Sequence, residues 1–254
     1  MWSVTPYPRC SFRCVYCVTS AQGESATAFT PASAAEETRR RLAELGQPRC
    51  LLLGAFSDAY PPEEAEAAVT RAIVEVLVNA HERFTIITKG DVVLRDLDLL
   101  LRAGERCLVQ ISLSCLHDDV LRQLDLHAPS GTRRLEVVDE LHRSGVPVAI
   151  NALPWIPGIT DAEAIIERVP ADVDIVFSPL AFGPGRDSMR LLQRRITRDE
   201  VWAAYLDAYE SLGHHANTSW VQPSMPPNEN HPLNRLPQRR HPPERPDARM
   251  VARC

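Results

Sequence analysis

Short apolar runs alternate with longer amphipathic segments along most of this chain. The apolar runs are rich in Val, Ile, Leu and Phe, which favours β-strands, and they lie at residues 50–54, 84–88, 108–112, 146–150 and 173–177. The segments between them repeat apolar residues at helical spacing, which predicts helices at 34–45, 63–80, 94–103, 118–124, 131–144 and 161–169. Two of these helices are preceded by capping-type residues, Ser33 and Thr160.

This alternation predicts an α/β fold built on a parallel sheet. With a short first strand near residues 2–5, the chain provides about six βα units joined by right-handed crossovers. A closed barrel of this kind needs eight units, so we expect an open, partial (β/α)6 barrel. Functional side chains in such folds follow the carboxyl ends of the strands.

The composition changes after a last expected helix at 199–212. From residue 214 onward prolines recur among Arg, Asn and His, and they are paired at 226–227 and 242–243. A segment of this composition buries little apolar surface. We therefore expect one barrel domain over residues 1–213 and a Pro- and Arg-rich, irregular tail over 214–254 that is extended or covers the mouth of the barrel.

Charge and hydropathy narrow the classes of function. The 254 residues carry a formal net charge of −5 at pH 7, which argues against a surface dedicated to nucleic acid. No apolar run reaches the roughly 18 residues of a membrane span, so no membrane partner is expected. The first residues lack the basic and apolar regions of a secretory signal. We expect a protein of the reducing cytoplasm, with thiols that are free or bound to metal.

Three of the seven cysteines lie on one short segment, as Cys10, Cys14 and Cys17. This spacing allows three thiolates to bind three irons of a cubane cluster and leaves the fourth iron open, whereas electron-transfer clusters use four cysteines. A structural zinc site needs a fourth ligand, and no second cysteine or histidine pair is nearby. A redox pair of Cys14 and Cys17 would leave Cys10 without a role. The other cysteines show no ligand spacing: Cys50, Cys107, Cys115 and Cys254.

The segment from Pro6 to Cys17 resembles the radical S-adenosylmethionine (SAM) superfamily, in which an aromatic residue commonly precedes the third cysteine, as Tyr16 does here. The resemblance implies a [4Fe-4S] cluster whose open iron is chelated by SAM. One electron from the reduced cluster would split SAM into methionine and a 5′-deoxyadenosyl radical, which abstracts a hydrogen atom from the substrate. It also implies an external one-electron donor of the flavodoxin or ferredoxin type.

Further motifs resemble the spore photoproduct lyase-like group of that superfamily. They are Gly-x-x-Ser-Asp-x-Tyr at 54–60, Thr-Lys at 88–89, Ile-Ser at 111–112, Ala-Pro at 128–129, Arg-Leu at 134–135 and Ala-Leu-Pro at 152–154. Two features depart from the group. Its repair enzymes carry a hydrogen-donor cysteine two residues before the position of Ser57, where this chain has Ala55. The Gly-Gly-Glu segment of many radical SAM enzymes is also absent.

The resemblance implies a role for several residues at strand ends. Lys89 and Ser112 would hold the SAM carboxylate, and Ser57 would lie beside the cofactor. The adenine would be lined by Tyr16 and by the backbone from Ala152 to Pro154. The placement of Lys89 also suits this role on physical grounds, because a cation directly after an apolar strand neutralises a carboxylate there.

The substrate is expected to be a small molecule, such as a nucleoside or a sugar, in a biosynthetic reaction. Two alternatives stay open: a nucleic-acid lesion repair lyase of the spore photoproduct lyase type, and a non-catalytic iron–sulfur redox protein. Candidate substrate contacts are polar or aromatic residues that follow strands, namely Asp58, Tyr60, Asn151 and Trp155.

Overall fold

Six parallel strands form one sheet within the part of the chain that the structure describes. The structure is a computed structural model and describes residues 2–14, 16–17, 29–46, 50–155, 160 and 162–179. The strands are Trp2–Val4 (β1), Leu51–Leu53 (β2), Phe84–Thr88 (β3), Cys107–Ser112 (β4), Val148–Trp155 (β5) and Asp174–Pro179 (β6). The helix expected at 199–212 and the tail expected at 214–254 lie outside the described residues.

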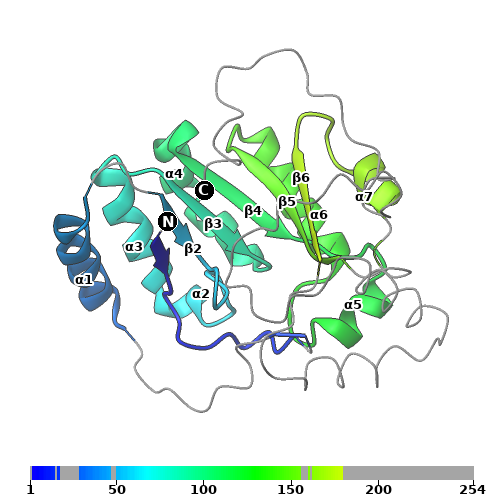
Figure 1. Ribbon diagram of the computed structural model, residues 1–254, viewed down its shortest axis with the longest axis horizontal. Coiled ribbons are helices and arrows are strands. Elements are labelled where there is room, and N and C mark those ends of the chain that lie inside the picture. The colour runs from blue at the N-terminus through cyan, green and yellow to red at the C-terminus, as the bar shows by residue number, and fades with distance from the viewer. Residues whose placement is uncertain are drawn as a thin grey trace, which may run out of the picture.

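The order of the strands in the sheet is the order in the chain, from β1 at one edge to β6 at the other (Figure 1). Each strand pairs in parallel with the next. The sheet is therefore open, which confirms the expected α/β fold with a six-stranded parallel sheet. β5 begins two residues later and ends five residues later than predicted, because its pairing with β6 continues through an irregularity between Ala152 and Trp155.

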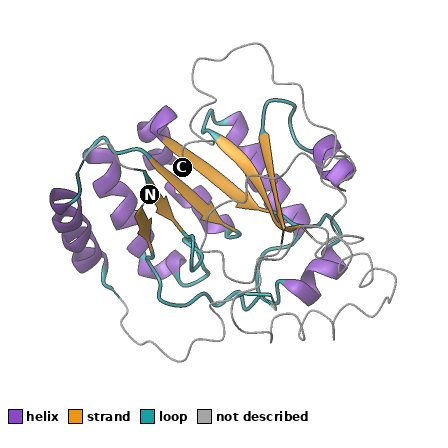
Figure 2. Ribbon diagram, viewed as in Figure 1, coloured by secondary structure: helices purple, strands orange, loops and turns teal. Residues whose placement is uncertain are grey.

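Helices connect consecutive strands, as the alternating pattern predicts (Figure 2). They are Pro31–Glu44 (α1), Glu64–Ala67 (α2), Val69–Asn79 (α3), Leu97–Ala103 (α4), Asp118–Leu124 (α5), Gly131–Arg143 (α6) and Ala162–Arg168 (α7), with short 3-10 helices at Asp91–Asp96 (η1) and Gly104–Arg106 (η2). Neighbouring helices pack against each other, α1 on α3 and α3 on α4, and α6 packs on β4 and β5. In the described residues, no helix combines the length and the apolar character that a membrane crossing requires.

Several helix bounds differ from the prediction, and two of the differences have an identifiable physical cause. α1 begins at Pro31, and its N-cap is Thr30, whose side chain accepts from the backbone N–H of Ser33. Ser33 thus occupies the third helical position of a capping box instead of the cap itself. The helix expected at 63–80 is two helices, because Ala68 adopts a left-handed conformation with φ of 50°. The carboxylate of Glu64 caps the second one by accepting from the backbone N–H groups of the residues that follow.

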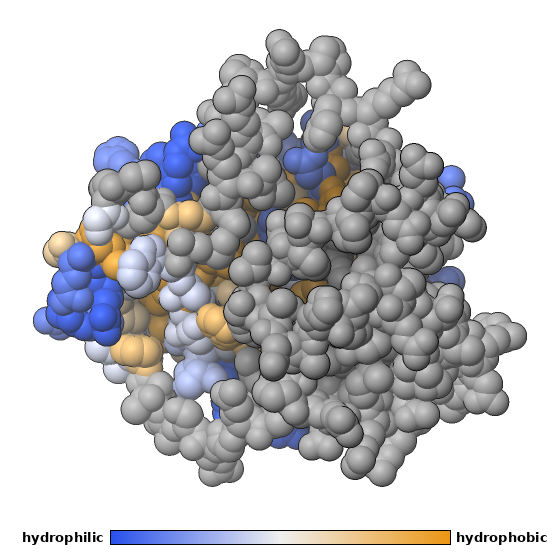
Figure 3. Space-filling view, viewed as in Figure 1, coloured by the Kyte–Doolittle hydropathy of each residue, from blue (hydrophilic) through white to orange (hydrophobic). Residues whose placement is uncertain are grey.

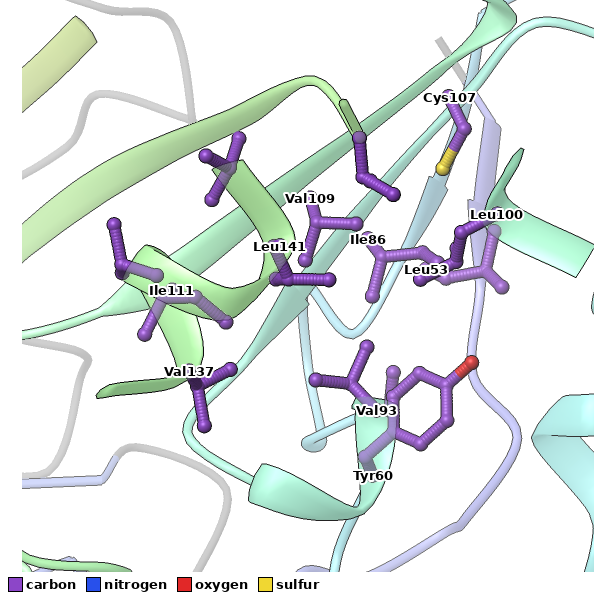
Figure 4. Packing of buried hydrophobic residues seen from close by; sticks show 14 of the residues in the cluster. Leu53, Tyr60, Ile86, Val93, Leu100, Cys107, Val109, Ile111, Val137 and Leu141 are labelled. Atoms are coloured by element: carbon purple, nitrogen blue, oxygen red, sulfur yellow. The ribbon is translucent and has the colours of Figure 1, made fainter. Parts of the chain in front are cut away.

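Apolar side chains from the middle of the sheet form the core together with the helices that cover it. Ile86, Val109 and Ile111 of β3 and β4 are buried and lie next to Val137 and Leu141 of α6 (Figure 4). Each such side chain contributes about 1.5–3 kcal/mol when it is fully buried. This packing holds the strands rigidly, so that the loops at their carboxyl ends are anchored to a fixed platform.

Two glycines allow the loops after β2 and β3 to approach each other closely. Gly54 has φ of +90°, and a Cβ there would lie 2.1 Å from the carbonyl oxygen of Ile87. A Cβ on Gly90 would lie 1.9 Å from the carbonyl oxygen of Tyr60. Any side chain at these positions would push the two loops apart. The glycines therefore shape the edge of the sheet at which the candidate site lies.

Candidate functional site

The three clustered cysteines lie on the loop that follows β1 at the carboxyl edge of the sheet. We call residues 5–17 the cysteine loop; Val15 within it lies outside the described residues. Cys14 is buried, Cys10 and Cys17 are half-buried, and none of the three forms a disulfide. The backbone N–H of Cys17 donates to the carbonyl oxygen of Cys14 at 3.1 Å. The loop thus presents three thiols from one short segment, as the sequence predicts.

The first half of the cysteine loop is tied to α2. The hydroxyl of Tyr7 donates to the buried carboxylate of Glu64. The hydroxyl of Ser11 donates to Glu63 at 2.8 Å, and the carbonyl oxygen of Phe12 accepts from the backbone N–H of His127 at 3.0 Å. These contacts hold the loop from both sides of Cys10.

Lys89 follows β3. It is the only lysine in the sequence, and the other 27 of the 28 Lys and Arg residues are arginines. Its Nζ lies 5.7 Å from the centroid of the Tyr16 ring, which places the cation beside the cysteine loop. Burial lowers the pKa of Lys89, but electrostatic interactions with Cys14 and with Asp125 outweigh burial and hold that pKa above its usual value. Within the described residues, Nζ forms no hydrogen bond or ion pair.

Asp58 links the loop after β2 to the end of β3. Its carboxylate accepts from the backbone N–H of Lys89 at 2.7 Å, from that of Tyr60 at 2.9 Å and from the hydroxyl of Thr88. Burial raises the pKa of Asp58 and the nearby charge of Lys89 opposes that shift. Because these three donors occupy its oxygens, Asp58 supports the loops of the site, and a direct substrate contact would compete with them.

Ser112 ends β4, and Ser57 lies on the loop after β2. Ser57 and Ser112 are both buried. The hydroxyl oxygens of Ser57 and of Ser114 have no hydrogen-bond partner among the described residues. Buried hydroxyls are normally satisfied, so these two are suited to a ligand that the protein itself does not supply.

The remaining candidates divide into two groups. Asn151 and Ala152 are buried in β5, and Pro154 follows them near the carboxyl end of that strand, joined to Leu153 by a cis peptide bond. The backbone of Trp155 ends β5, and its side chain lies outside the described atoms. Tyr60 is fully buried in the core, where its hydroxyl donates to Asp96 at 3.1 Å. This burial removes Tyr60 from the side chains that can reach a substrate.

The residues that sequence reasoning missed are a pair of buried charges next to Cys14. Asp125 and Arg134 form an ion pair with Nη1 of the arginine 2.7 Å from Oδ2 of the aspartate. The hydroxyl of Tyr16 donates to Asp125. Burial raises the pKa of Asp125, but the charges of Lys89 and Arg134 outweigh it and hold that pKa below its usual value. A pattern of apolar and polar positions places charged residues in solvent. Of the two, only Arg134 belongs to a motif noted in the sequence, the Arg-Leu at 134–135.

The donor set of the cysteine loop fits a cubane cluster. Among the described residues, no three His, Cys, Asp or Glu side chains converge on a point that a single metal ion could occupy. A cubane does not require such convergence, because each cysteine binds a different iron. Burial raises the pKa of Cys10 to about 12, helped by the charge of Asp58, and burial also raises the pKa of Cys14. Iron binding would replace these thiol protons.

Two further cysteines lie at the start of β4 and just after its end. Cys107 begins β4 and Cys115 follows its end, and both are buried thiols. The Sγ of Cys115 accepts from the backbone N–H of His117 at 3.3 Å. Cys50, which precedes β2, is disulfide-bonded, so the expectation that all thiols are free or metal-bound was wrong at that position.

A pocket of about 530 Å³ lies between β1 and α1, away from these residues. Its lining includes Trp2 and Phe29, which are 52% and 42% exposed. Figure 3 shows the hydrophobic and hydrophilic surfaces that adjoin in this region of the molecule. Because none of the candidate residues lines this pocket, it is not part of the site at the carboxyl edge of the sheet.

Solved structures share this fold at low sequence identity. SuiB from Streptococcus suis, bound to S-adenosylmethionine, aligns with a TM-score of 0.55 and 15% identity over 82% of this chain and 48% of its own. A single-site mutant of spore photoproduct lyase aligns with a TM-score of 0.53 and 13% identity over 73% of this chain and 57% of its own. At these identities the similarity establishes the fold alone.

The relatives detected by sequence are uncharacterized proteins. One from Methanocaldococcus jannaschii is 28% identical over 116 residues, which are 46% of this chain and 44% of that protein. One from Acidianus two-tailed virus is 26% identical over 133 residues, which are 52% of this chain and 42% of that protein. The alignments thus span less than half of the length of these relatives.

A model of a protein superfamily matches this sequence over most of the residues that form the described fold. The family model of the radical SAM superfamily matches residues 4–169, from β1 through α7. That range includes the cysteine loop, Lys89 and the strand ends around them. Enzymes of this superfamily use a [4Fe-4S] cluster together with SAM, and the donor set described above fits both. The chain belongs to the radical SAM superfamily.

Proposed function

We propose that this chain generates a substrate radical from SAM, with Cys10, Cys14 and Cys17 as the three protein ligands of a [4Fe-4S] cluster. The observation that carries the proposal is the position of Lys89 beside the cysteine loop, with its Nζ 5.7 Å from the centroid of the Tyr16 ring. When bound, the cluster and SAM supply a one-electron cleavage that yields methionine and a 5′-deoxyadenosyl radical, which abstracts a hydrogen atom from the substrate. An external flavodoxin or ferredoxin supplies the electron.

The protein's own residues bind and orient the cofactor. Lys89 neutralises the SAM carboxylate, and Ser112 donates a hydrogen bond to it. The hydroxyl of Ser57 has no partner among the described residues and is therefore available to hydrogen-bond the same ligand. Tyr16 contributes its ring to the adenine side, because its hydroxyl is already bonded to Asp125. The backbone from Ala152 to Pro154 lines the other side of the adenine.

The substrate is a small molecule such as a nucleoside or a sugar, in a biosynthetic reaction of the cytoplasm. Ala55 supports this choice over DNA repair, because the repair enzymes of the spore photoproduct lyase-like group carry a hydrogen-donor cysteine at that position. The formal net charge of −5 also disfavours binding to a polyanion. Asn151 and Trp155, at the end of β5, are the residues proposed to contact the substrate.

Anaerobic reconstitution with iron and sulfide tests the proposal. The wild type should bind about four irons per chain. Reduced with dithionite in the presence of SAM, it should form 5′-deoxyadenosine, whereas Cys14→Ala should form none. Cys107→Ala is the matched control, because it removes a buried thiol outside the cysteine loop and should retain cluster and activity. A cluster that is reduced but never cleaves SAM, even with metabolite extracts, would favour the redox-protein alternative.

The repair alternative has its own test. Binding of single-stranded and duplex DNA is measured at about 50 mM and 200 mM salt. A DNA enzyme would lose affinity steeply between these concentrations, because phosphate contacts release counterions. We expect weak binding with no steep dependence on salt.

A further inference from the structure

Both side chains of the Asp125–Arg134 ion pair are buried. The two side chains are 0% and 1% exposed. In the described part of the chain, no other ion pair has both partners so deeply buried. Burying two charges costs several kcal/mol for each ion, and apolar residues often serve stability equally well. A pair of this kind at the edge of a candidate site calls for a role beyond packing.

Asp125 contacts the second half of the cysteine loop. Its backbone pairs with that of Cys14 in an isolated antiparallel bridge. Its carboxylate accepts from the hydroxyl of Tyr16. The aspartate therefore touches this half of the loop through both main chain and side chain.

Arg134 connects the same carboxylate to the sheet. Its Nη1 donates to the carbonyl oxygen of Ser112, at the end of β4, at 3.1 Å. Its Nε donates to the carbonyl oxygen of Pro129, just before α6, at 2.8 Å. Its Nη2 is buried and has no partner among the described residues. One guanidinium thus bridges the strand end, the start of α6 and, through Asp125, the cysteine loop.

We propose that Asp125 and Arg134 form a positioning pair that fixes Cys14 and Tyr16 against the end of β4 and sets the charge beside the iron–sulfur cluster. The inference rests on the proposed function, because it assigns the pair a role toward that cluster. Reduction adds one negative charge to the cluster, so its potential responds to the charges next to its ligands. Asp125 disfavours reduction, and Arg134 offsets that effect.

The two members of the pair should therefore shift the reduction potential in opposite directions. Asp125→Asn removes a negative charge, retains an oxygen that accepts from Tyr16, and should make the cluster easier to reduce. Arg134→Gln leaves the carboxylate without its counter-charge and should make the cluster harder to reduce. The double variant should lie between the two. A pair that only stabilises the fold would not produce shifts of opposite sign.

A buried carboxylate outside the cysteine loop is the matched control. Asp96 is fully buried in η1 and pairs with Arg71 and Arg95. Asp96→Asn should lower the stability of the protein, as the loss of a buried partner does, and leave the potential of the cluster at the wild-type value. Tyr16→Phe is a milder variant of the pair itself. It removes one hydrogen bond from Asp125 and should make reduction slightly harder.

The experiment is a redox titration of the reconstituted full chain, monitored by electron paramagnetic resonance, with iron content and circular dichroism measured on each variant. Shifts of the potential in opposite directions for Asp125→Asn and Arg134→Gln support the inference. Loss of the cluster from these two variants also supports it, provided that both stay folded and that Asp96→Asn retains the cluster. Wild-type potentials in both variants overturn it. If both variants fail to fold, a wild-type potential and signal in Tyr16→Phe overturns it as well. A wild type that binds no cluster would refute the proposed function itself.

Discussion

Replacing Lys89 by methionine should weaken the binding of SAM without disturbing the cluster. Methionine matches lysine in length and shape but carries no charge. Nζ forms no ion pair or hydrogen bond within the described residues, so the substitution breaks no direct polar contact there. A hydrogen bond to a charged group contributes about 1.5–3 kcal/mol. The Kd for SAM should therefore rise roughly 10- to 150-fold.

A set of ligands separates the carboxylate contact from the rest of the site. S-adenosylhomocysteine carries the same amino-acid group as SAM and should lose affinity by the same factor. Methylthioadenosine has no carboxylate and should bind Lys89→Met and wild type equally. The control is Arg102→Met, which removes an exposed cation of α4 that is bonded to Asn79. An equal loss for all three ligands would contradict the assignment, because it would indicate a general distortion of the site.

The single lysine also gives a direct spectroscopic probe. Labelling with 15N-lysine yields one backbone amide signal, from the N–H that donates to Asp58 at 2.7 Å. Addition of SAM should shift this signal, and addition of methylthioadenosine should shift it less. If SAM binds and the signal stays in place, the carboxylate is held elsewhere.

Three further variants test the architecture around the site. Gly90→Ala should destabilise the protein by about 3 kcal/mol, the upper end for overpacking, because its Cβ would lie 1.9 Å from a carbonyl oxygen. Its control is Gly46→Ala, where the Cβ has open space and the free energy of unfolding in urea should change by no more than about 0.5 kcal/mol. Glu64→Gln should lower the free energy of unfolding by about 2–3 kcal/mol, because this fully buried carboxylate pairs with an arginine and caps α3. Its control is the exposed Glu63→Gln, which should leave the urea midpoint almost unchanged. Tyr60→Phe should lower the melting temperature and leave KM for the substrate unaltered; a large change in KM would restore Tyr60 to the substrate site.

The hydrophobic pattern was sufficient to predict the order of the elements. β3 and α5 have the predicted bounds, and the six strands pair in the order of the chain. The strands of a parallel sheet are buried on both faces, so they appear as nearly continuous apolar runs that a single sequence reveals. The cysteine spacing pointed to the cluster for a similar reason, because its information is local.

The differences arise where distant residues decide the local structure. Ala68 has good helix propensity, yet the chain breaks there because the carboxylate of Glu64 caps the next helix. Tyr60 follows a strand end, where exposure is common, but its ring is buried beside Val93 (Figure 4). Neither outcome can be read from local spacing, because each depends on a neighbour that the fold brings into contact.

The burial of a charged residue at the candidate site was also not predictable from the local sequence. Arg134 follows the polar start of α6, and a pattern of apolar and polar positions would place it in water, but its side chain is 1% exposed. It is buried because Asp125 balances its charge and the backbone carbonyls of Ser112 and Pro129 accept hydrogen bonds from it. Those partners come from three separate segments. A buried cation of this kind therefore becomes recognisable only when the sheet has assembled, and its cost in free energy is the physical reason to assign it to the cluster.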